Sequence, residues 1–117
     1  MSMRPTWSAL PALVLALWSV AASAQSTTGS ISGVIADSSG AILPGADIVV
    51  VHTDTGLERR QVTDATGFFR VLNLNPGIYV LTAEMPGFRS RTVDALAVSV
   101  TRDLRVDLSL RDRKSVV

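Results

Sequence analysis

Short runs in which hydrophobic and polar residues alternate cover most of the chain after residue 29, and turn-forming residues separate these runs. Side chains two positions apart in an extended run share a face, as Ile31 and Ile35 do in the first run and Ile48 and Val50 in the second. This period is typical of strands that bury one face, and no window has a helical period. We therefore predict strands within residues 30–36, 47–53, 58–63, 68–72, 78–85, 89–93 and 96–110, with a turn at 101–103 in the last.

The same alternation assigns inner and outer faces to the predicted strands. Phe69 and Val71 share one inner face and Tyr79, Leu81 and Ala83 share another, whereas Phe68, Arg70 and Leu72 point away from the core. The polar run 58–63 suits an edge, because its charges discourage pairing with other chains. The pattern predicts an all-β fold, a seven-stranded antiparallel β-sandwich.

The amino terminus has the layout of a secretory signal peptide. Arg4 precedes an apolar run from about Ala9 to Val20, and small residues around Ala24 provide a cleavage site. The rival interpretation, a membrane anchor, needs a run of about 20 apolar residues, and this run is shorter and contains Pro11. We expect residues 1–24 to be removed, residues 25–28 to form a polar lead, and the mature chain to have no membrane span.

Charge and cysteine content narrow the class of protein. The chain has 11 basic and 10 acidic residues, and removal of Arg4 with the signal peptide balances them. A balanced mature chain has no basic field for nucleic acid. There is no cysteine, so a single small exported domain must hold its core without disulfides.

The residues that carry chemistry are sparse. His52 is the only histidine, which rules out a multi-histidine zinc site and leaves the serines without a base that the sequence could assign. Asp37, Asp54 and Asp64 each precede a glycine, and we expect them to cap their own turns rather than to bind calcium, since their spacing is not that of a calcium loop. We predict no enzymatic activity, no cofactor and no metal site.

Three long segments then show a resemblance to a known family: GSISGVIADSSGAILPGADIVV, TDATGFFRVLNLNPGIYVLTAEMPGF and LAVSVTRDLRVDLSL. Their order and spacing resemble those of the carboxypeptidase regulatory-like domain, a transthyretin-like β-sandwich grouped with carbohydrate-binding-like folds, over residues 29–110. In exported bacterial proteins this module commonly follows the signal peptide of TonB-dependent outer-membrane receptors. The resemblance implies a non-catalytic periplasmic module associated with the outer membrane.

The final residues 111–117, RDRKSVV, depart from the alternation, and we interpret them as a solvated tail. A receptor would continue with a plug and many membrane strands. We therefore expect the sequence to be a fragment of such a receptor, with a small secreted protein as the alternative.

The outward hydrophobic positions form the candidate contact surface. A protein partner, or the remainder of a larger receptor chain, would cover a face of this kind. A secreted carbohydrate-binding module is the alternative function, with the ring of Phe68 as the platform for a sugar. The candidate surface residues are Val49, Val51, Phe68, Arg70 and Leu72.

Overall fold

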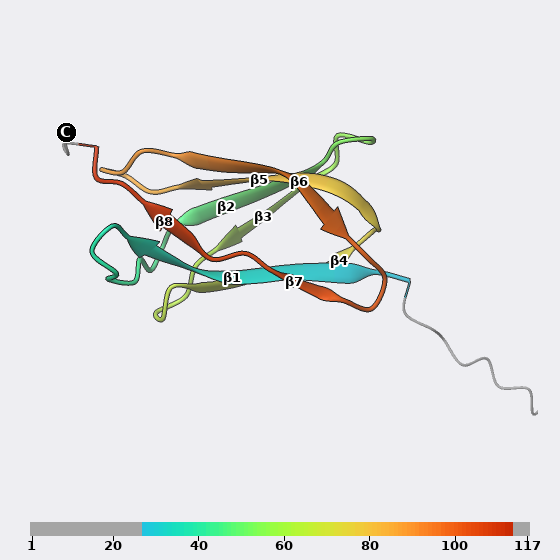
Figure 1. The fold of residues 1–117 in the computed structure, drawn as a ribbon, viewed down its shortest axis with the longest axis horizontal. Helices are drawn as coiled ribbons and strands as arrows, with labels where there is room; N and C mark the ends of the chain where they lie inside the picture. Colours follow the sequence, from blue (N-terminus) through green and yellow to red (C-terminus); the bar gives the residue numbers. More distant parts are fainter. Residues whose placement is uncertain (1–26, 114–117) are drawn as a thin grey trace, which may run out of the picture.

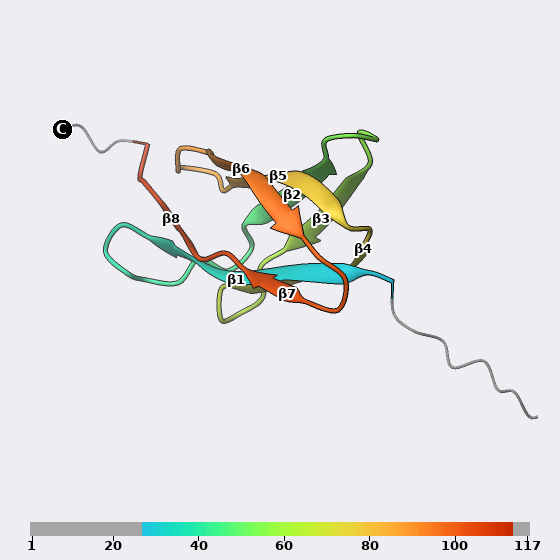
Figure 2. The same ribbon diagram turned by 45° about the vertical axis from the view of Figure 1, so that its right-hand side comes forward.

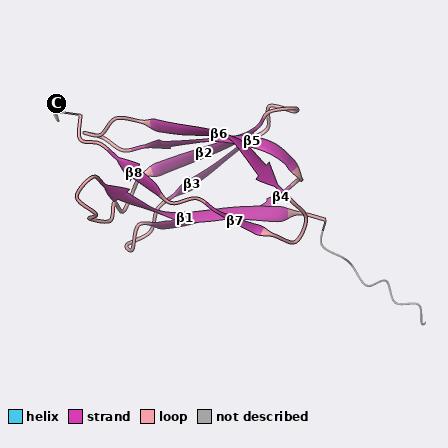
Figure 3. Ribbon diagram, in the orientation of Figure 1, coloured by secondary structure: helices cyan, strands magenta, loops and turns pink. Residues whose placement is uncertain are grey.

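The computed structural model describes residues 27–113, which fold into strands joined by loops (Figures 1 and 3). The signal peptide predicted for residues 1–24 and the last four residues of the predicted tail lie outside the described residues. The strands are β1 (Gly29–Asp37), β2 (Asp47–His52), β3 (Glu58–Val62), β4 (Phe68–Leu74), β5 (Gly77–Glu84), β6 (Arg91–Val98), β7 (Asp103–Arg105) and β8 (Leu108–Leu110).

These strands form two facing sheets, which confirms the predicted β-sandwich. One sheet has the order β4-β1-β7, with β8 also paired to β1, and the other has the order β3-β2-β5-β6. The strand count is eight instead of seven. Two predicted pieces, 89–93 and 96–100, contribute to one bulged strand, β6, in which Ala95 adopts φ 57°, and the predicted run 104–110 divides into β7 and β8.

The prediction of a wholly antiparallel fold was wrong, because β7 and β8 run parallel to β1. After β6, at the edge of one sheet, the chain crosses to the other sheet and returns beside β1 (Figure 2). Local alternation specifies which side chains face inward, but it carries no information about the direction of a neighbour so distant in the sequence.

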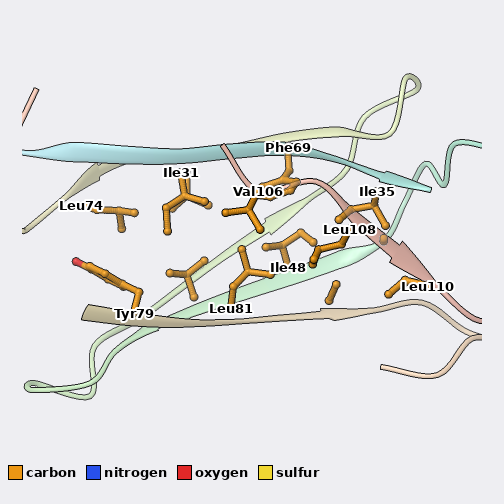
Figure 4. Packing of buried hydrophobic residues seen from close by; sticks show 14 of the residues in the cluster. Ile31, Ile35, Ile48, Phe69, Leu74, Tyr79, Leu81, Val106, Leu108 and Leu110 are labelled. Carbon is orange, nitrogen blue, oxygen red and sulfur yellow. The ribbon is translucent and has the colours of Figure 1, made fainter. Parts of the chain in front are cut away.

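The core lies between the two sheets, and its side chains point toward one another in Figure 4. Phe69 is 1% exposed, while Ile48 and Leu81 are fully buried, so the predicted inner faces are confirmed. Burial of such side chains is the main favourable term in folding. The largest fully buried hydrophobic side chains are Phe69, Ile31, Ile35, Ile48, Leu74, Leu81, Leu110 and Val50.

An arginine connects the two sheets on the side where β3 and β4 form their edges. Arg59 of β3 donates hydrogen bonds from Nη1 to the carbonyl of Asn73 and from Nη2 to that of Leu72, at 3.3 and 3.0 Å. The bonds occupy carbonyl groups at the edge of β4, where an unpaired strand could otherwise attract another chain. The predicted edge position of β3 is confirmed.

The first residues of the predicted tail are part of the fold. Asp112 forms a bridge with Phe88, Arg89 N–H donates to the Arg111 carbonyl, and Arg113 N–H donates to the Gly87 carbonyl. The side chains of residues 111–113 are exposed, as expected for a solvated tail, but their backbone is paired. The backbone pairing thus extends beyond residue 110, where we predicted the domain to end.

Candidate functional site

The five predicted surface residues do not form one surface. Phe68, Arg70 and Leu72 lie on the outer face of β4, whereas Val49 and Val51 lie on the outer face of β2, in the other sheet. The core separates the two groups, because each sheet turns its inner face toward the other. Alternation assigned all five outward correctly, but it could not assign β2 and β4 to the same or to different sheets.

The outer face of β4 carries one aromatic ring, Phe68, beside Arg70 and the exposed Leu72. The guanidinium carbon of Arg70 lies 5.7 Å from the ring centroid of Phe68, and that of Arg105 on β7 lies 6.0 Å from it. Both are within the range of cation–π contact. Because guanidinium groups already lie over the ring, Phe68 offers less free aromatic surface to a sugar than the sequence suggested.

Asp103 of β7 connects three strands of this sheet. Its carboxylate accepts hydrogen bonds from Ser30 Oγ and Ser32 Oγ of β1, at 2.6 and 2.5 Å, and lies 4.0 Å from Arg70 Nη2 of β4. Desolvation raises the pKa of Asp103, but the two serine hydrogen bonds and the charges of Arg70 and Arg105 outweigh it, so the pKa is lowered.

A second carboxylate on the same face also has its partners within the domain. Asp107 Oδ1 accepts from Arg105 Nε and from Val34 N–H, at 2.8 and 2.9 Å, and these bonds lower its pKa. Sequence reasoning missed both carboxylates. The outward serines at positions 30 and 32 were a possible signal, but more than 70 residues separate them from Asp103.

The outer face of the other sheet is aliphatic in its middle. Val49 and Val51 of β2 lie beside Thr82 and Val80 of β5, their register partners, and Ile78 of β5 is 43% exposed. An antiparallel sheet with one solvated face normally carries polar residues there. Sequence reasoning predicted the two β2 positions but missed Ile78 and Val80, which the alternation of β5 already places opposite its core residues.

One corner of this second face is acidic. Asp47 of β2 and Glu84 of β5 are register partners, and both are exposed. They line a hollow of about 350 Å³ together with Met85, Pro86, Phe88, Ser90 and Arg113. Like charges placed directly opposite each other in a sheet repel.

Two of the three predicted aspartate caps are confirmed. Asp37 Oδ1 accepts from the N–H groups of Ser39 and Ala41, and Asp64 Oδ1 accepts from those of Thr66 and Phe68. Such bonds close Asx turns. The glycines that end these turns have φ of 94° and 75°, values that glycine adopts without strain.

His52, and not Asp54, closes the remaining turn. Its carbonyl accepts from Gly56 N–H at 2.7 Å, and its Nδ1 lies 3.4 Å from Thr55 N, which donates to it. The ring packs edge-on against Tyr79, with centroids 4.8 Å apart. His52 is buried at 7% exposure and has a structural place, so the prediction for Asp54 was wrong because a neighbouring side chain supplies the acceptor.

The described part of the chain holds no group of three or more His, Cys, Asp or Glu side chains that could bind a metal ion. Over the same residues, 27–113, there is no helix of the length and apolar character that a membrane crossing requires.

A family model for the carboxypeptidase regulatory-like domain matches residues 30–111, from β1 to just beyond β8. The chain belongs to this family. The family and the sandwich architecture agree with the resemblance found in the sequence, and the match includes every strand of both sheets.

This carboxypeptidase regulatory-like domain is similar in sequence to a transporter. The TonB-dependent transporter Oar of Myxococcus xanthus is 38% identical to it over 96 residues, which cover 80% of this chain and 9% of the transporter. The chain therefore spans about a tenth of the length of that relative.

Solved structures show the same fold in proteins of several kinds. The minor pilin GBS52 of Streptococcus agalactiae gives a TM-score of 0.61 at 14% identity, over 80% of this chain and 48% of the pilin. A candidate carbohydrate-binding protein of Bacteroides uniformis gives 0.57 at 23% identity, over 69% of this chain and 40% of that protein. Catechol 1,2-dioxygenase of Acinetobacter radioresistens gives 0.56 at 14% identity, covering 77% and 56%. At these identities the likeness concerns the fold alone.

Proposed function

We propose that this domain is a non-catalytic periplasmic module of a TonB-dependent outer-membrane receptor, placed at the amino terminus of that receptor. The similarity to the Myxococcus transporter over 80% of the chain carries the proposal. The signal-like sequence of residues 1–24 supports export, after which the domain would fold in the periplasm.

The role of the module is to make a protein contact or to act as a folded spacer while the receptor imports its substrate. On the β4-β1-β7 face, Arg70 pairs with Asp103 and Arg105 pairs with Asp107. The His52 ring accepts a hydrogen bond within a turn. Neither arrangement presents an activated nucleophile or a general base to a substrate. What supports a contact role is the aliphatic outer face of the other sheet.

The coding sequence that follows Val117 in the genome tests the receptor proposal. We expect the reading frame to continue into the plug and membrane-spanning regions of a receptor. A stop codon in clean sequence, with no receptor-coding region after it, would contradict the proposal.

A secreted carbohydrate-binding module is the second candidate function, and the outward position of Phe68 favours it. Saturable binding to a polysaccharide that Phe68→Ala weakens without unfolding the domain would support it. The contacts of Arg70 and Arg105 with the ring argue against a free sugar platform, so we expect a glycan array to give no specific signal.

A further inference from the structure

The outer face of the β3-β2-β5-β6 sheet has a continuous aliphatic strip along its two central strands. We call Val49, Val51, Ile78 and Val80 the aliphatic strip. Thr82 extends it toward β6, where its hydroxyl lies 3.2 Å from that of Thr92. Cross-strand pairs such as Val51 and Val80 stabilise the sheet, and a row of outward aliphatic side chains is also a surface that can exclude water with a partner.

The opposite face of the sandwich is built differently. There, Asp103 and Asp107 accept hydrogen bonds from serine hydroxyls, a backbone N–H and an arginine. Its charged groups already have their partners inside the domain. A docking partner would have to break these bonds to use them, so the aliphatic strip is the better contact face.

The charged residues beside the strip indicate which charge a partner should carry. The register places Glu58 beside Val51, Arg60 beside Val49, and the Asp47–Glu84 pair at the end of the central strands. With Arg113, which lines the hollow at this end, these groups are three carboxylates and two guanidinium groups, so their net charge is negative. Within residues 27–113, no ion pair involves Asp47 or Glu84, although Arg113 lines the same hollow.

The hollow at this corner has the chemistry to receive a basic side chain. Asp47 and Glu84 provide the anionic end, while Met85 and Phe88 provide apolar walls. Lysine and arginine side chains bury an aliphatic stem and keep the charge at the tip, so they match such a site. A cation there would also relieve the repulsion between the two carboxylates.

We propose that the aliphatic strip, with the Asp47–Glu84 corner, docks a separate protein through a segment in which aliphatic residues lie beside lysine or arginine. This proposal rests on the receptor function proposed above and names the face and the partner chemistry for it. A second copy of this domain would place the same net negative surface on both sides of the contact, which makes it the poorer match.

A peptide titration tests the proposal on the 117-residue chain. The probe is a short peptide in which lysine and valine alternate, and the matched peptide carries glutamate in place of lysine. In two-dimensional NMR, we expect the lysine peptide to shift the amides of the strip and the acidic corner selectively. The glutamate peptide should produce little change.

Charge neutralisation at the corner gives the decisive comparison. The double substitution Asp47→Asn with Glu84→Gln should weaken binding of the lysine peptide about five- to tenfold, as expected for the loss of two exposed charge contacts. The control, Asp54→Asn, removes an exposed carboxylate in the turn that follows β2, at the end of this strand away from Asp47, and should have a much smaller effect. Circular dichroism checks that both variants fold.

Three results would overturn the proposal. Equal binding of both peptides would show that the acidic corner does not select a basic partner. Shifts confined to the β4-β1-β7 face would show that the contact lies on the other sheet. Self-association through the strip in analytical ultracentrifugation would make a second copy the occupant. None of these results bears on the receptor proposal, which the genomic sequence tests separately.

Discussion

Asp103 illustrates how a single carboxylate can join strands that the sequence keeps apart. It holds two serines of β1 and approaches Arg70 of β4, and its pKa is lowered because these hydrogen bonds and charges outweigh the opposing effect of desolvation. The same direction of shift occurs at Asp37, Asp64 and Asp107. All four carboxylates therefore favour the folded state when ionised.

The domain should lose stability in acid through these groups. A folded pKa below the ordinary value of 3.8 contributes stability that is present above 3.8 and is lost as the pH falls through the folded pKa. Urea unfolding at a series of pH values should thus show a free energy of unfolding that falls below about pH 4. Asp103→Asn should make that fall shallower, and an unchanged acid dependence in this variant would contradict the role of Asp103.

Adjacent aromatic residues on β4 should respond very differently to truncation. Phe69 is buried in the core, so Phe69→Ala should lower the free energy of unfolding by about 3–5 kcal/mol. Phe68 is partly exposed and contacts guanidinium groups, so Phe68→Ala should cost about 1 kcal/mol. Chemical denaturation measures both, and the reverse order of effects would mean that the two faces of β4 are assigned wrongly.

Gly33 is required for close packing of the last segment on β1. A Cβ at this position would collide with the carbonyl oxygen of Val106. We expect Gly33→Ala to cost about 3 kcal/mol or more, because backbone must move to make room. Gly40→Ala is the control: its φ is 94° but the space around it is open, so about 1 kcal/mol is expected from thermal or urea unfolding. Equal costs would show that the segment does not pack closely there.

At the scale of elements, Arg59 is the contact that spans the open side between β3 and β4. Arg59→Ala removes two hydrogen bonds to the carbonyls of Leu72 and Asn73 and should cost about 1 kcal/mol, since the pair is exposed to solvent. Hydrogen exchange should become faster in β4. Arg60→Ala is the matched control on the outer face, and an equal effect of both substitutions would argue against a specific connection.

The elements show which parts of this fold are encoded locally. A period of two residues depends only on neighbouring positions, so it predicted the inner residues of β4 and β5 and the edge character of β3. Sheet membership and strand direction depend on distant pairing. The parallel return of β7 and β8 beside β1, and the placement of Val49 and Phe68 on opposite sides of the sandwich, therefore could not be predicted.

The same distinction between local and distant contacts applies to the candidate site. Outward positions such as Val51 and Arg70 followed from alternation, whereas the serine–aspartate cluster and the Asp47–Glu84 corner require the register between strands. Similarly, the cap at Asp64 follows from its own turn sequence, but the role of His52 in closing the 53–56 turn depends on where its buried ring lies. Residue spacing therefore predicts contacts within one turn or strand, but it does not predict contacts between side chains on different strands.

At the scale of the whole molecule, we propose that this domain is part of an exported receptor and does not act alone. The Myxococcus relative is about ten times as long as the aligned segment, and the family match includes both sheets of the domain. A receptor of this kind would carry the domain into the periplasm and keep it at the outer membrane. The proposal therefore predicts both a product much longer than this chain and its location at the outer membrane.

The receptor proposal can be tested by an immunoblot of fractionated cells, with an antibody raised against the folded domain. We predict a single product much larger than the 117-residue chain in the outer-membrane fraction, with the domain epitope sensitive to protease only after the periplasm is opened. A product no larger than this chain, recovered from the cytoplasm or from the culture medium, would contradict this proposal.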